Sequence, residues 1–527
     1  MSLKIFSLSM ISKFTFSKLL KGLRNNWLTF AFFIIILFSL PFRLYKFTYP
    51  LLDAFHFRQT QTATFTLNFY KHGINLLQTE LDIFGIGRER FLLLEFPLYE
   101  AIVATLYNIF FVSEAWGRLT SIFAGFIGSW YLLRLVDLVA GKKQVALLSA
   151  FFFLFTPINM FYQRAYLIEP TIIACLLSGT FYSCYWLKRK DSKSYFLALT
   201  LLTLGLIQKG LYGPFWLLAI VYYYIKNKGI EQINAKKFIF LISFPLFVLF
   251  FWQKHVNYVN TTNGHTFFTS SSREHLEWNF GLLSDRFSIS MWDYRARQIL
   301  NGLFLKPGVV LFLIGLITLR QFDRKGFFYV FLLSQLIYFI TVFRIQSQNY
   351  YQLVITPSVA PFLAVGLVYT AKVVTKIILF VKPLRTKRVI VEFAIVVIIL
   401  FGYALRSWKS MLPSFYIDWK WYRDITAISA SVPKKTYGIF ATPGNEWNSV
   451  YTYYSGRVMK TVGVEEVSQS NINKWKEMGY KFLVLHEFQK YPEYLLRVKQ
   501  SHSLEFLTDY TKVLENQSFK VYLFNET

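Results

Sequence analysis

Polar and ionisable side chains interrupt an otherwise apolar chain at a few defined places. The first is the stretch 53–63, DAFHFRQTQTA, which directly follows a long apolar run and contains Asp53, His56, Arg58 and Gln59. Ionisable groups near a membrane surface are costly unless they form pairs or take part in chemistry. This stretch is therefore a candidate catalytic or binding segment.

Further candidates for the same site follow later in this loop and in three later polar turns. They are Glu95, Arg164, Glu169, Lys209, Arg344, Asn349, Tyr350 and Tyr351. A carboxylate can act as a general base toward a hydroxyl group, and Lys or Arg can bind a phosphate. The set suits a substrate that has an anionic part and a hydroxyl group to be activated. Asp53 is the candidate base, and Arg58, Lys209 and Arg344 are the candidate phosphate ligands.

Several of these residues also have a purely structural interpretation. Asp53 could cap the helix expected to start at residue 55, because Asp is a favoured N-cap residue. Arg164 and Glu169 could form an ion pair that holds two spans in register. Lys209 could extend its amine from a helix end toward water. His56 suits a hydrogen bond better than a metal ion.

No metal or nucleotide site is predicted. The loop 253–301 contains three histidines and two acids, which are His255, His265, His275, Glu274 and Glu277. They could bind a divalent cation, but their spacing matches no typical metal motif. A divalent cofactor therefore stays an open alternative. The chain also has no glycine-rich phosphate loop. An activated substrate carried by a lipid would need none.

The composition indicates a polytopic helical membrane protein. Of 527 residues, 54% are hydrophobic and only 16% are charged, whereas soluble proteins have about 25% charged residues. The formal net charge is +28, but the basic residues occur in short runs between apolar segments. That distribution is typical of cytoplasmic loops beside anionic lipid and argues against nucleic-acid binding.

About eleven transmembrane helices are predicted from the apolar segments. They start at roughly 28, 118, 144, 168, 195, 212, 238, 302, 327, 353 and 389. The shorter run 96–112 contains Pro97 and Glu100 and is predicted to be a helix lying in the membrane interface. The basic residues Lys4, Lys13, Lys18, Lys21 and Arg24 precede the first span. No cleavage site follows this span, so it is predicted to be a retained anchor.

The basic connectors predict which loops meet on the opposite side of the membrane. The basic connectors are 141–143, 188–193, 226–237, 320–325 and 382–388. If all of them are cytoplasmic, an even number of spans separates each connector from the next. The N-terminus is then inside and the C-terminus outside. The polar segments then lie together on the outer face; they are 47–117, 163–170, 208–214, 253–301, 344–352 and the chain after 406.

The chain is predicted to divide into a transmembrane domain, 1–405, and a small extracytoplasmic α/β domain, 406–527. Alternation of short apolar strands with helices predicts this second fold. The predicted strands are 437–441, 481–486 and 520–524, and the predicted helices are 418–431 and 471–480. The tail contains no recognisable phosphate loop, so it is interpreted as a recognition or support module.

Four stretches in order resemble the dolichyl-phosphate-mannose protein mannosyltransferase-like glycosyltransferases of the C-type superfamily. This family includes bacterial transferases that add aminoarabinose to lipid A. The four stretches are 53–77, 95–125 with its Pro-Leu-Tyr and Gly-Arg-Leu motifs, 155–170, and 348–366 with its Tyr-Tyr motif. The tail is similar only in type, through YYSGR (453–457). Departures include Phe57 where many relatives have Trp and Thr60-Gln61 where they have Ala-Asp, and Lys209 lies in a loosely matching turn.

The resemblance implies an inverting transfer of a monosaccharide from a polyprenyl-phosphate sugar to a cell-envelope lipid, glycan or protein. It implies that Asp53 is the catalytic base and that Glu169 is the second-loop acid. The reaction would take place at the outer face of a plasma membrane, for which a bacterial inner membrane is the expectation. The double acid of the eukaryotic protein mannosyltransferases is absent at 53–54, so a protein acceptor of that kind is not supported.

Two other classes of protein remain open from the sequence. A secondary transporter places ionisable residues and broken helices at the middle of the membrane and often has internal repeats. Here the spans are almost free of charge and no repeat is found. A non-catalytic envelope assembly protein could keep the same fold.

Overall fold

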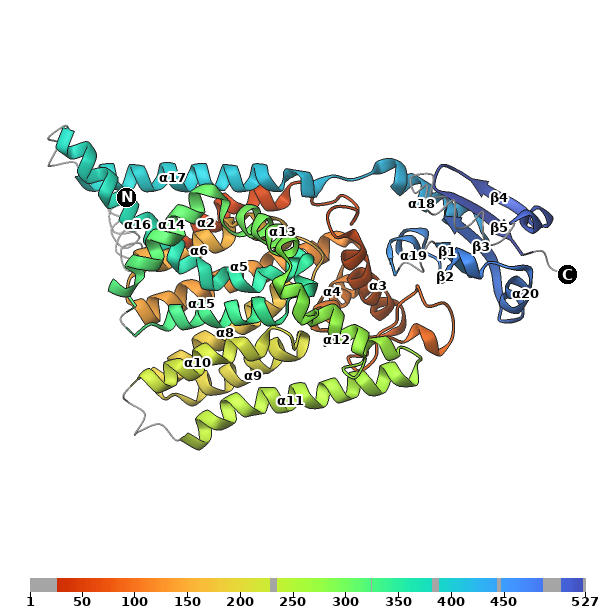
Figure 1. Ribbon diagram of the computed structural model, residues 1–527, viewed down its shortest axis with the longest axis horizontal. Helices are drawn as coiled ribbons and strands as arrows, with labels where there is room; N and C mark the ends of the chain where they lie inside the picture. Colours follow the sequence, from red (N-terminus) through yellow and green to blue (C-terminus); the bar gives the residue numbers. More distant parts are fainter. Residues whose placement is uncertain are drawn as a thin grey trace, which may run out of the picture.

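The computed structural model describes residues 26–227, 235–323, 325–381, 388–442, 447–486 and 504–524. Most of the chain forms one elongated helical bundle, and a small mixed α/β unit lies at one end of it (Figure 1). The N-terminal basic residues predicted to precede the first span lie outside the described ranges. Parts of the basic connectors 226–237, 320–325 and 382–388 also lie outside them.

Every predicted apolar segment forms a helix in the bundle. These helices are α2 (Trp27–Leu44), α5 (Glu114–Ala140), α6 (Lys143–Phe155), α8 (Glu169–Arg189), α9 (Ser192–Gln208), α10 (Gly213–Lys226), α11 (Ala235–Thr262), α14 (Leu305–Thr318), α15 (Phe327–Thr341), α16 (Thr356–Val381) and α17 (Arg388–Met411). Within the described ranges, six helical stretches are long and apolar enough to cross a membrane, and two shorter apolar helices accompany them. The full count of about eleven spans stays a prediction.

Proline and glycine residues set several of these helix boundaries. Pro157 opens α7 (Pro157–Tyr162), and Pro170 and Pro214 lie in the first turns of α8 and α10, where a missing backbone N–H costs nothing. Gly141 ends α5 in the left-handed conformation, with φ +63°, which glycine adopts without strain. The polar turns before α8 and α10 are thereby held short.

The first outer loop contains helices α3 (His56–His72) and α4 (Leu98–Ile109), with the single turn η1 (Arg88–Arg90) between them. Helix α3 is polar, yet most of it is buried, and four threonine hydroxyls donate to the carbonyls one turn earlier. Such bonds satisfy hydroxyls that have no water to bind. Helix α4 confirms a helix within the run 96–112, and its depth in the membrane stays a prediction.

A second outer region follows α11 and contains only short helices. They are η3 (Thr266–Phe268), α12 (Arg273–Phe280), η4 (Leu283–Phe287), α13 (Ile289–Ile299) and η5 (Leu300–Phe304), and η6 (Leu319–Gln321), η7 (Arg344–Ser347) and η8 (Asn349–Ile355) follow later. The predicted start of this region at residue 253 is wrong, because α11 continues to Thr262. Trp252, Val256 and Val259 pack against Leu93 of the first outer loop there, and this contact extends the helix beyond its most apolar part.

The C-terminal unit is a five-stranded sheet in the order β2-β1-β3-β5-β4. Strand β1 (Tyr437–Thr442) pairs in parallel with β2 (Met459–Gly463) and β3 (Tyr480–His486), whereas β5 (Phe519–Leu523) is antiparallel to β3 and to β4 (Thr511–Glu515). The three predicted strands are confirmed, as are the helices α18 (Trp419–Ser431) and α20 (Gln469–Glu477). Strands β2 and β4 were not predicted, since each is only five residues long and contains charged side chains. The remaining helices of this unit are η10 (Leu412–Phe415), α19 (Val450–Ser455), η12 (Val464–Glu466) and η13 (Glu505–Asp509).

The first outer loop extends this sheet beyond its edge strand β2. The N–H groups of Met459 and Thr461 donate to the carbonyl oxygens of Asp82 and Ile83 at 3.0 and 2.9 Å. An open sheet edge carries unpaired backbone groups, which this pairing satisfies. The hydroxyl of Tyr454 adds a hydrogen bond of 3.0 Å to Glu114 at the start of α5. The C-terminal unit is therefore tied to the outer loops of the bundle.

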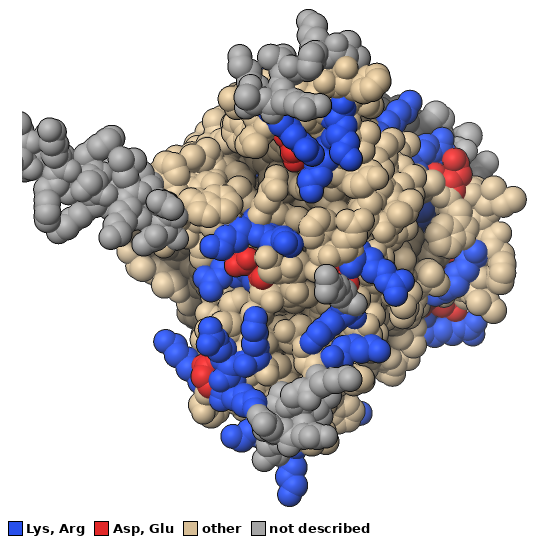
Figure 2. Space-filling model, turned by 90° about the vertical axis from the view of Figure 1, so that its left-hand side faces the viewer, with Lys and Arg blue, Asp and Glu red and all other residues tan. Residues whose placement is uncertain are grey.

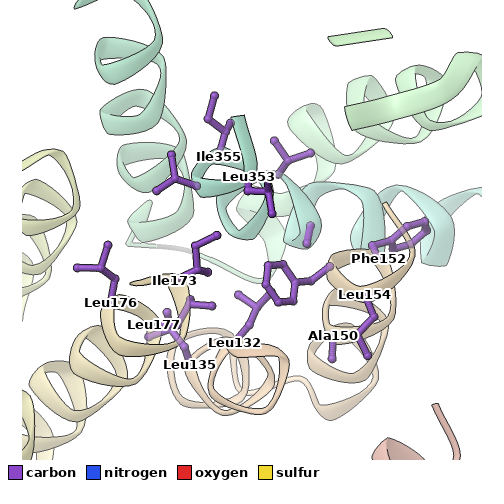
Figure 3. Close-up of a cluster of buried hydrophobic side chains, with 14 of the residues drawn as sticks. Leu132, Leu135, Ala150, Phe152, Leu154, Ile173, Leu176, Leu177, Leu353 and Ile355 are labelled. Atoms are coloured by element: carbon purple, nitrogen blue, oxygen red, sulfur yellow. The ribbon is translucent and has the colours of Figure 1, made fainter. Parts of the chain in front are cut away.

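The interior of the bundle is filled by apolar side chains. Figure 3 shows side chains of α5, α6, α8 and η8 converging in its apolar core, among them Leu132, Leu177, Phe152 and Leu353, all fully buried.

Figure 2 shows that Lys and Arg side chains gather on the end face opposite the C-terminal unit, with few acidic side chains between them. A basic end face of this kind agrees with the predicted common side of the basic connectors.

Helices α14 and α16 cross at backbone distance because a glycine of each helix lies against the backbone of the other. A Cβ atom on Gly366 would lie 1.9 Å from the carbonyl oxygen of Leu311, and one on Gly315 would lie 1.9 Å from that of Phe362. Small residues permit such close packing between membrane helices.

Replacing Gly366 with valine is expected to lower the Tm of the detergent-solubilised protein, because α14 and α16 would have to separate. Overpacking of this kind costs on the order of 1–3 kcal/mol. Gly402 in α17 has no neighbouring atom within 4 Å of its Cβ position, so Gly402→Val is the matched control. Thermal unfolding monitored by size-exclusion chromatography tests this, and equal Tm values for the two variants would contradict the close crossing.

Candidate active site

A cavity of about 1390 Å³ lies where the bundle meets the C-terminal unit. Its wall comes from α3, the end of the first outer loop, the turn after α9, α11, the η3–α12 region, residues 345–351 and the C-terminal unit. Five of the six segments predicted to lie on one face contribute to this wall, whereas the turn 163–170 does not. Charged groups line one part of the cavity, apolar side chains of α11 another, and aromatic rings a third.

The charged part is a cluster of two cations and two carboxylates. Arg58 contacts Glu95 at 2.6 Å, and Lys209 contacts Glu169 at 2.6 Å and Glu95 at 3.7 Å. We call these four residues the charge cluster. Arg58, Glu95 and Lys209 line the cavity, whereas Glu169 is fully buried behind Lys209. Four predicted site residues from three separate segments are thereby brought together.

Neighbouring charges favour the ionised forms of Arg58 and Glu95. Burial alone raises the pKa of Glu95, but Arg58 and Lys209 outweigh it and hold this pKa below its ordinary value. Burial alone lowers the pKa of Arg58, but Glu95 and its other neighbours hold it well above the ordinary value. The ring of Tyr351 lies 4.1 Å from the Lys209 amine and that of Tyr350 lies 5.5 Å from it, which adds cation–π stabilisation.

Asp53 lies in a separate buried network. Its Oδ1 accepts a hydrogen bond of 2.6 Å from Gln59, and its Oδ2 lies 3.5 Å from Arg164 and 3.6 Å from Arg118. Helix α3 has Phe55 as its N-cap residue and no side-chain cap bond, so the alternative that Asp53 caps this helix is wrong. Asp53 and Gln59 are not in the cavity wall, although His56 and Arg58 are.

The two buried arginines are held by backbone carbonyls as well as by Asp53. Arg118 donates to the carbonyls of Phe47 and Pro50 at 2.8 and 3.3 Å. The guanidinium of Arg164 lies 4.8 Å from the centre of the Phe415 ring. The alternative that Arg164 pairs with Glu169 is wrong, because Arg164 faces Asp53 instead. Arg118 is a residue that the sequence analysis missed, and its Gly-Arg-Leu motif was the available signal.

The remaining predicted residues divide into those near the cavity and those outside it. His56 lines the cavity and packs edge-on against Trp421 of α18, with 5.2 Å between the ring centres. Burial lowers the pKa of His56, and Asp53 opposes this shift. Asn349 accepts a hydrogen bond from the Tyr162 hydroxyl at 2.5 Å. Arg344 is exposed on η7 and is not part of the wall, so the structure does not bring it to the charge cluster.

The loop histidines are engaged in other contacts. His255 contacts the carbonyl oxygen of Leu77 at 2.8 Å, and His265 contacts that of Glu89 at 2.6 Å. Within the part of the chain that the structure describes, no three His, Cys, Asp or Glu side chains lie together in a group that could hold a metal ion.

Comparison of sequences supports the family resemblance over part of the chain. Residues 95–253 match the family model described as dolichyl-phosphate-mannose-protein mannosyltransferase. This range contains Glu95, Arg164, Glu169 and Lys209, and it runs from the end of the first outer loop into α11. No curated protein matches the chain significantly.

Comparison of structures identifies the fold. ArnT from Cupriavidus metallidurans, bound to undecaprenyl phosphate, superposes with a TM-score of 0.63 over 93% of this chain and 97% of ArnT, at 13% identity. The oligosaccharyltransferase of Archaeoglobus fulgidus, in complex with Zn and sulfate, superposes with a TM-score of 0.53 over 86% of this chain and 68% of that chain, at 11% identity. The family-model match and the shared fold together confirm the predicted resemblance. The long apolar helices of the described residues agree with an integral membrane protein.

Replacing Lys209 with methionine is expected to destabilise the protein because it leaves Glu169 buried without its cation. Breaking such a pair costs about 3–5 kcal/mol, whereas replacing both partners costs much less. Tm should therefore fall in Lys209→Met and recover in part in the double variant that also carries Glu169→Gln.

The exposed pair Arg273 and Glu277 provides the control for this experiment. The side chain of Arg273 is 87% exposed, so Arg273→Met should leave Tm almost unchanged. A double variant whose Tm loss equals the sum of the two single losses would contradict the buried pairing.

Proposed function

We propose that this chain is an inverting glycosyltransferase that moves a monosaccharide from a polyprenyl-phosphate sugar to a cell-envelope acceptor. The observation that carries the proposal is a single cavity with a charge cluster in one part and the apolar side of α11 in another. A lipid-linked phosphate needs both surroundings, because its head is anionic and its chain is apolar. The resemblance to a family of sugar transferases supports the same class of reaction.

Helix α11 offers the lipid chain a route from the bilayer. Only 17% of its most apolar window is buried. Leu246 and Phe250 line the cavity and are 36% and 56% exposed. These exposed apolar side chains offer a surface along which a polyprenyl chain can extend toward the lipid while its phosphate enters the cavity.

Arg58 and Lys209 are the proposed ligands of the donor phosphate. Both face the cavity and both contact Glu95, whose side chain is 20% exposed. An entering phosphate would take the place of the Glu95 carboxylate on these cations. In the reaction, the acceptor oxygen forms a bond to the anomeric carbon as the bond from that carbon to the phosphate oxygen breaks. The leaving polyprenyl phosphate keeps the electron pair, and the two cations stabilise its charge.

Asp53 is the proposed base and Glu169 the acid that orients Lys209. The acceptor hydroxyl proton would pass to the Asp53 carboxylate as the oxygen attacks. Gln59, Arg118 and Arg164 hold that carboxylate in one orientation. Since Asp53 lies beside the cavity wall and not in it, the proposal requires that the acceptor reaches it past His56. Lipid, glycan and protein acceptors are all compatible with this chemistry.

The proposed orientation places the active site at the outer face of a plasma membrane, as in a bacterial inner membrane. The cavity lies at the end of the bundle next to the C-terminal unit, and the basic end face is opposite (Figure 2). Positively charged ends stay in the cytoplasm. The N-terminus would then be cytoplasmic and the C-terminal domain, proposed as residues 406–527, extracytoplasmic.

Asp53→Asn is expected to reduce sugar transfer by on the order of 10²–10⁴-fold, the usual contribution of a general base. The measurement is transfer from a panel of radiolabelled undecaprenyl-phosphate sugars into membrane acceptors, at matched expression. Binding of the donor to the purified variant should stay close to that of wild type.

The Tm of the Asp53→Asn variant separates catalysis from folding, because Arg118 and Arg164 lose their carboxylate. A variant that keeps both its Tm and full transfer would remove the base assignment and direct attention to Glu169. Failure of the wild-type protein to transfer any sugar of the panel would count against the glycosyltransferase proposal and favour a transporter or an assembly protein.

Glu95→Gln is expected to strengthen the binding of undecaprenyl phosphate, because the neutral amide no longer competes with the phosphate for Arg58 and Lys209. A hydrogen bond to a charged group contributes about 1.5–3 kcal/mol, so Kd should fall roughly tenfold or more. Titration with undecaprenyl phosphate in detergent measures this. Arg58→Gln should have the opposite effect, and weaker binding in both variants would contradict the competition.

A further inference from the structure

The third part of the cavity is lined by aromatic rings from three distant segments. Phe84 comes from the first outer loop, His265 and Phe268 from the region after α11, and Trp447 from the C-terminal unit. Phe84 lies 4.3 Å from His265, and Trp447 lies 4.6 Å from Phe268, measured between ring centres. We call these four residues the aromatic platform.

Two members of the aromatic platform, Phe268 and His265, are held in place by hydrogen bonds that involve buried groups. Asn260 of α11 donates to the carbonyls of Leu93 and Phe268 at 2.8 and 3.1 Å and accepts from the N–H of Leu93 at 2.9 Å. His265 contacts the carbonyl of Glu89 at 2.6 Å. A binding surface held in this way loses little conformational entropy when a ligand binds.

Polar groups border the same part of the cavity. Lys460 of β2 and Glu89 of the first outer loop form an ion pair of 2.7 Å, and both line the cavity. The Glu89 side chain is 51% exposed, so its oxygens can accept further hydrogen bonds. His275 also lines the cavity, and its buried Nδ1 has no hydrogen-bond partner among the residues that the structure describes. A buried polar atom of this kind is costly unless a ligand satisfies it.

We infer that the aromatic platform binds a sugar ring of the acceptor, so that the acceptor class is a glycan. A pyranose ring has faces of C–H groups, which pack on aromatic rings, and hydroxyl groups at its edge, which need donors and acceptors. The platform and the border formed by Lys460, Glu89 and His275 supply both. The inference rests on the proposed function, because it assigns the second substrate of the same cavity.

A glycan fits this part of the cavity better than a lipid chain or a peptide. A lipid chain would cover the exposed Glu89–Lys460 ion pair with apolar atoms and offer no hydrogen bond to the Nδ1 of His275, and α11 already offers an apolar surface. An extended peptide is commonly bound by adding a strand to a sheet edge, but the edge strand β2 is already paired with Asp82 and Ile83. Trp447 is 37% exposed, and a large ring left open at a cavity wall is available for stacking.

The test is saturation-transfer difference NMR on the purified full chain with a panel of methyl glycosides and short oligosaccharides. Methyl glycosides of glucose, galactose, mannose and N-acetylglucosamine, and their disaccharides, serve as probes. At least one saccharide is expected to show signals on its ring C–H protons, and Trp447→Ala should reduce them at least fivefold. Trp447→Phe keeps an aromatic face and should retain most of the signal.

Trp419→Ala is the matched control, because Trp419 is an exposed tryptophan of α18 outside the cavity. Two outcomes would overturn the inference. Either the saccharide signals persist unchanged in Trp447→Ala, or no saccharide of the panel gives signals with the wild-type protein. Phe268→Ala gives a second independent variant if Trp447→Ala fails to fold.

The experiment does not depend on transfer, so the two proposals can fail separately. Saccharide signals that require Trp447, in a protein that transfers no sugar, would support the aromatic platform and contradict the proposed function. Transfer activity in a protein whose saccharide signals do not require Trp447 would support the function and overturn the platform.

Discussion

Neutralisation of buried charge at the end of the bundle beside the C-terminal unit is the constraint on which the other features depend. Arg118, Arg164 and Lys209 are all almost completely removed from solvent, and each needs a carboxylate or carbonyl oxygen within reach. Asp53 is the carboxylate partner of Arg118 and Arg164, and Glu169 is that of Lys209. Because these partners come from different loops, satisfying the charges also joins the start of α3, the start of α5, the turn before α8 and the turn after α9.

The first outer loop carries most of this organisation. It provides Asp53 and Gln59 for the buried network, Arg58 and Glu95 for the charge cluster, and backbone carbonyls that extend the C-terminal sheet. The same segment therefore determines the floor of the cavity, its charge and the position of the domain that closes one side of it. A change in this loop would alter donor binding and domain docking together.

The cavity brings together three environments that a transfer between a lipid and a glycan would use. Apolar side chains of α11 line one part of it, the charge cluster lies at its polar part, and the aromatic platform lies against the C-terminal unit. The C-terminal unit, expected only to support or recognise, contributes Trp447 and Lys460 to the wall. This contribution gives the tail a specific place in acceptor binding.

The amino-acid sequence by itself determined the helices, the common face of the polar loops and most members of the charge cluster. Apolar length and basic connectors are local properties, and carboxylates and cations next to apolar runs are conspicuous in composition. Only the tertiary structure decided the pairing: Arg164 faces Asp53 and not Glu169, Arg118 joins the network, and Arg344 remains outside. Strand β2 likewise forms because the first outer loop and β1 flank it. Pairing depends on the rotation and depth of each helix, and these are set by packing between segments distant in the chain.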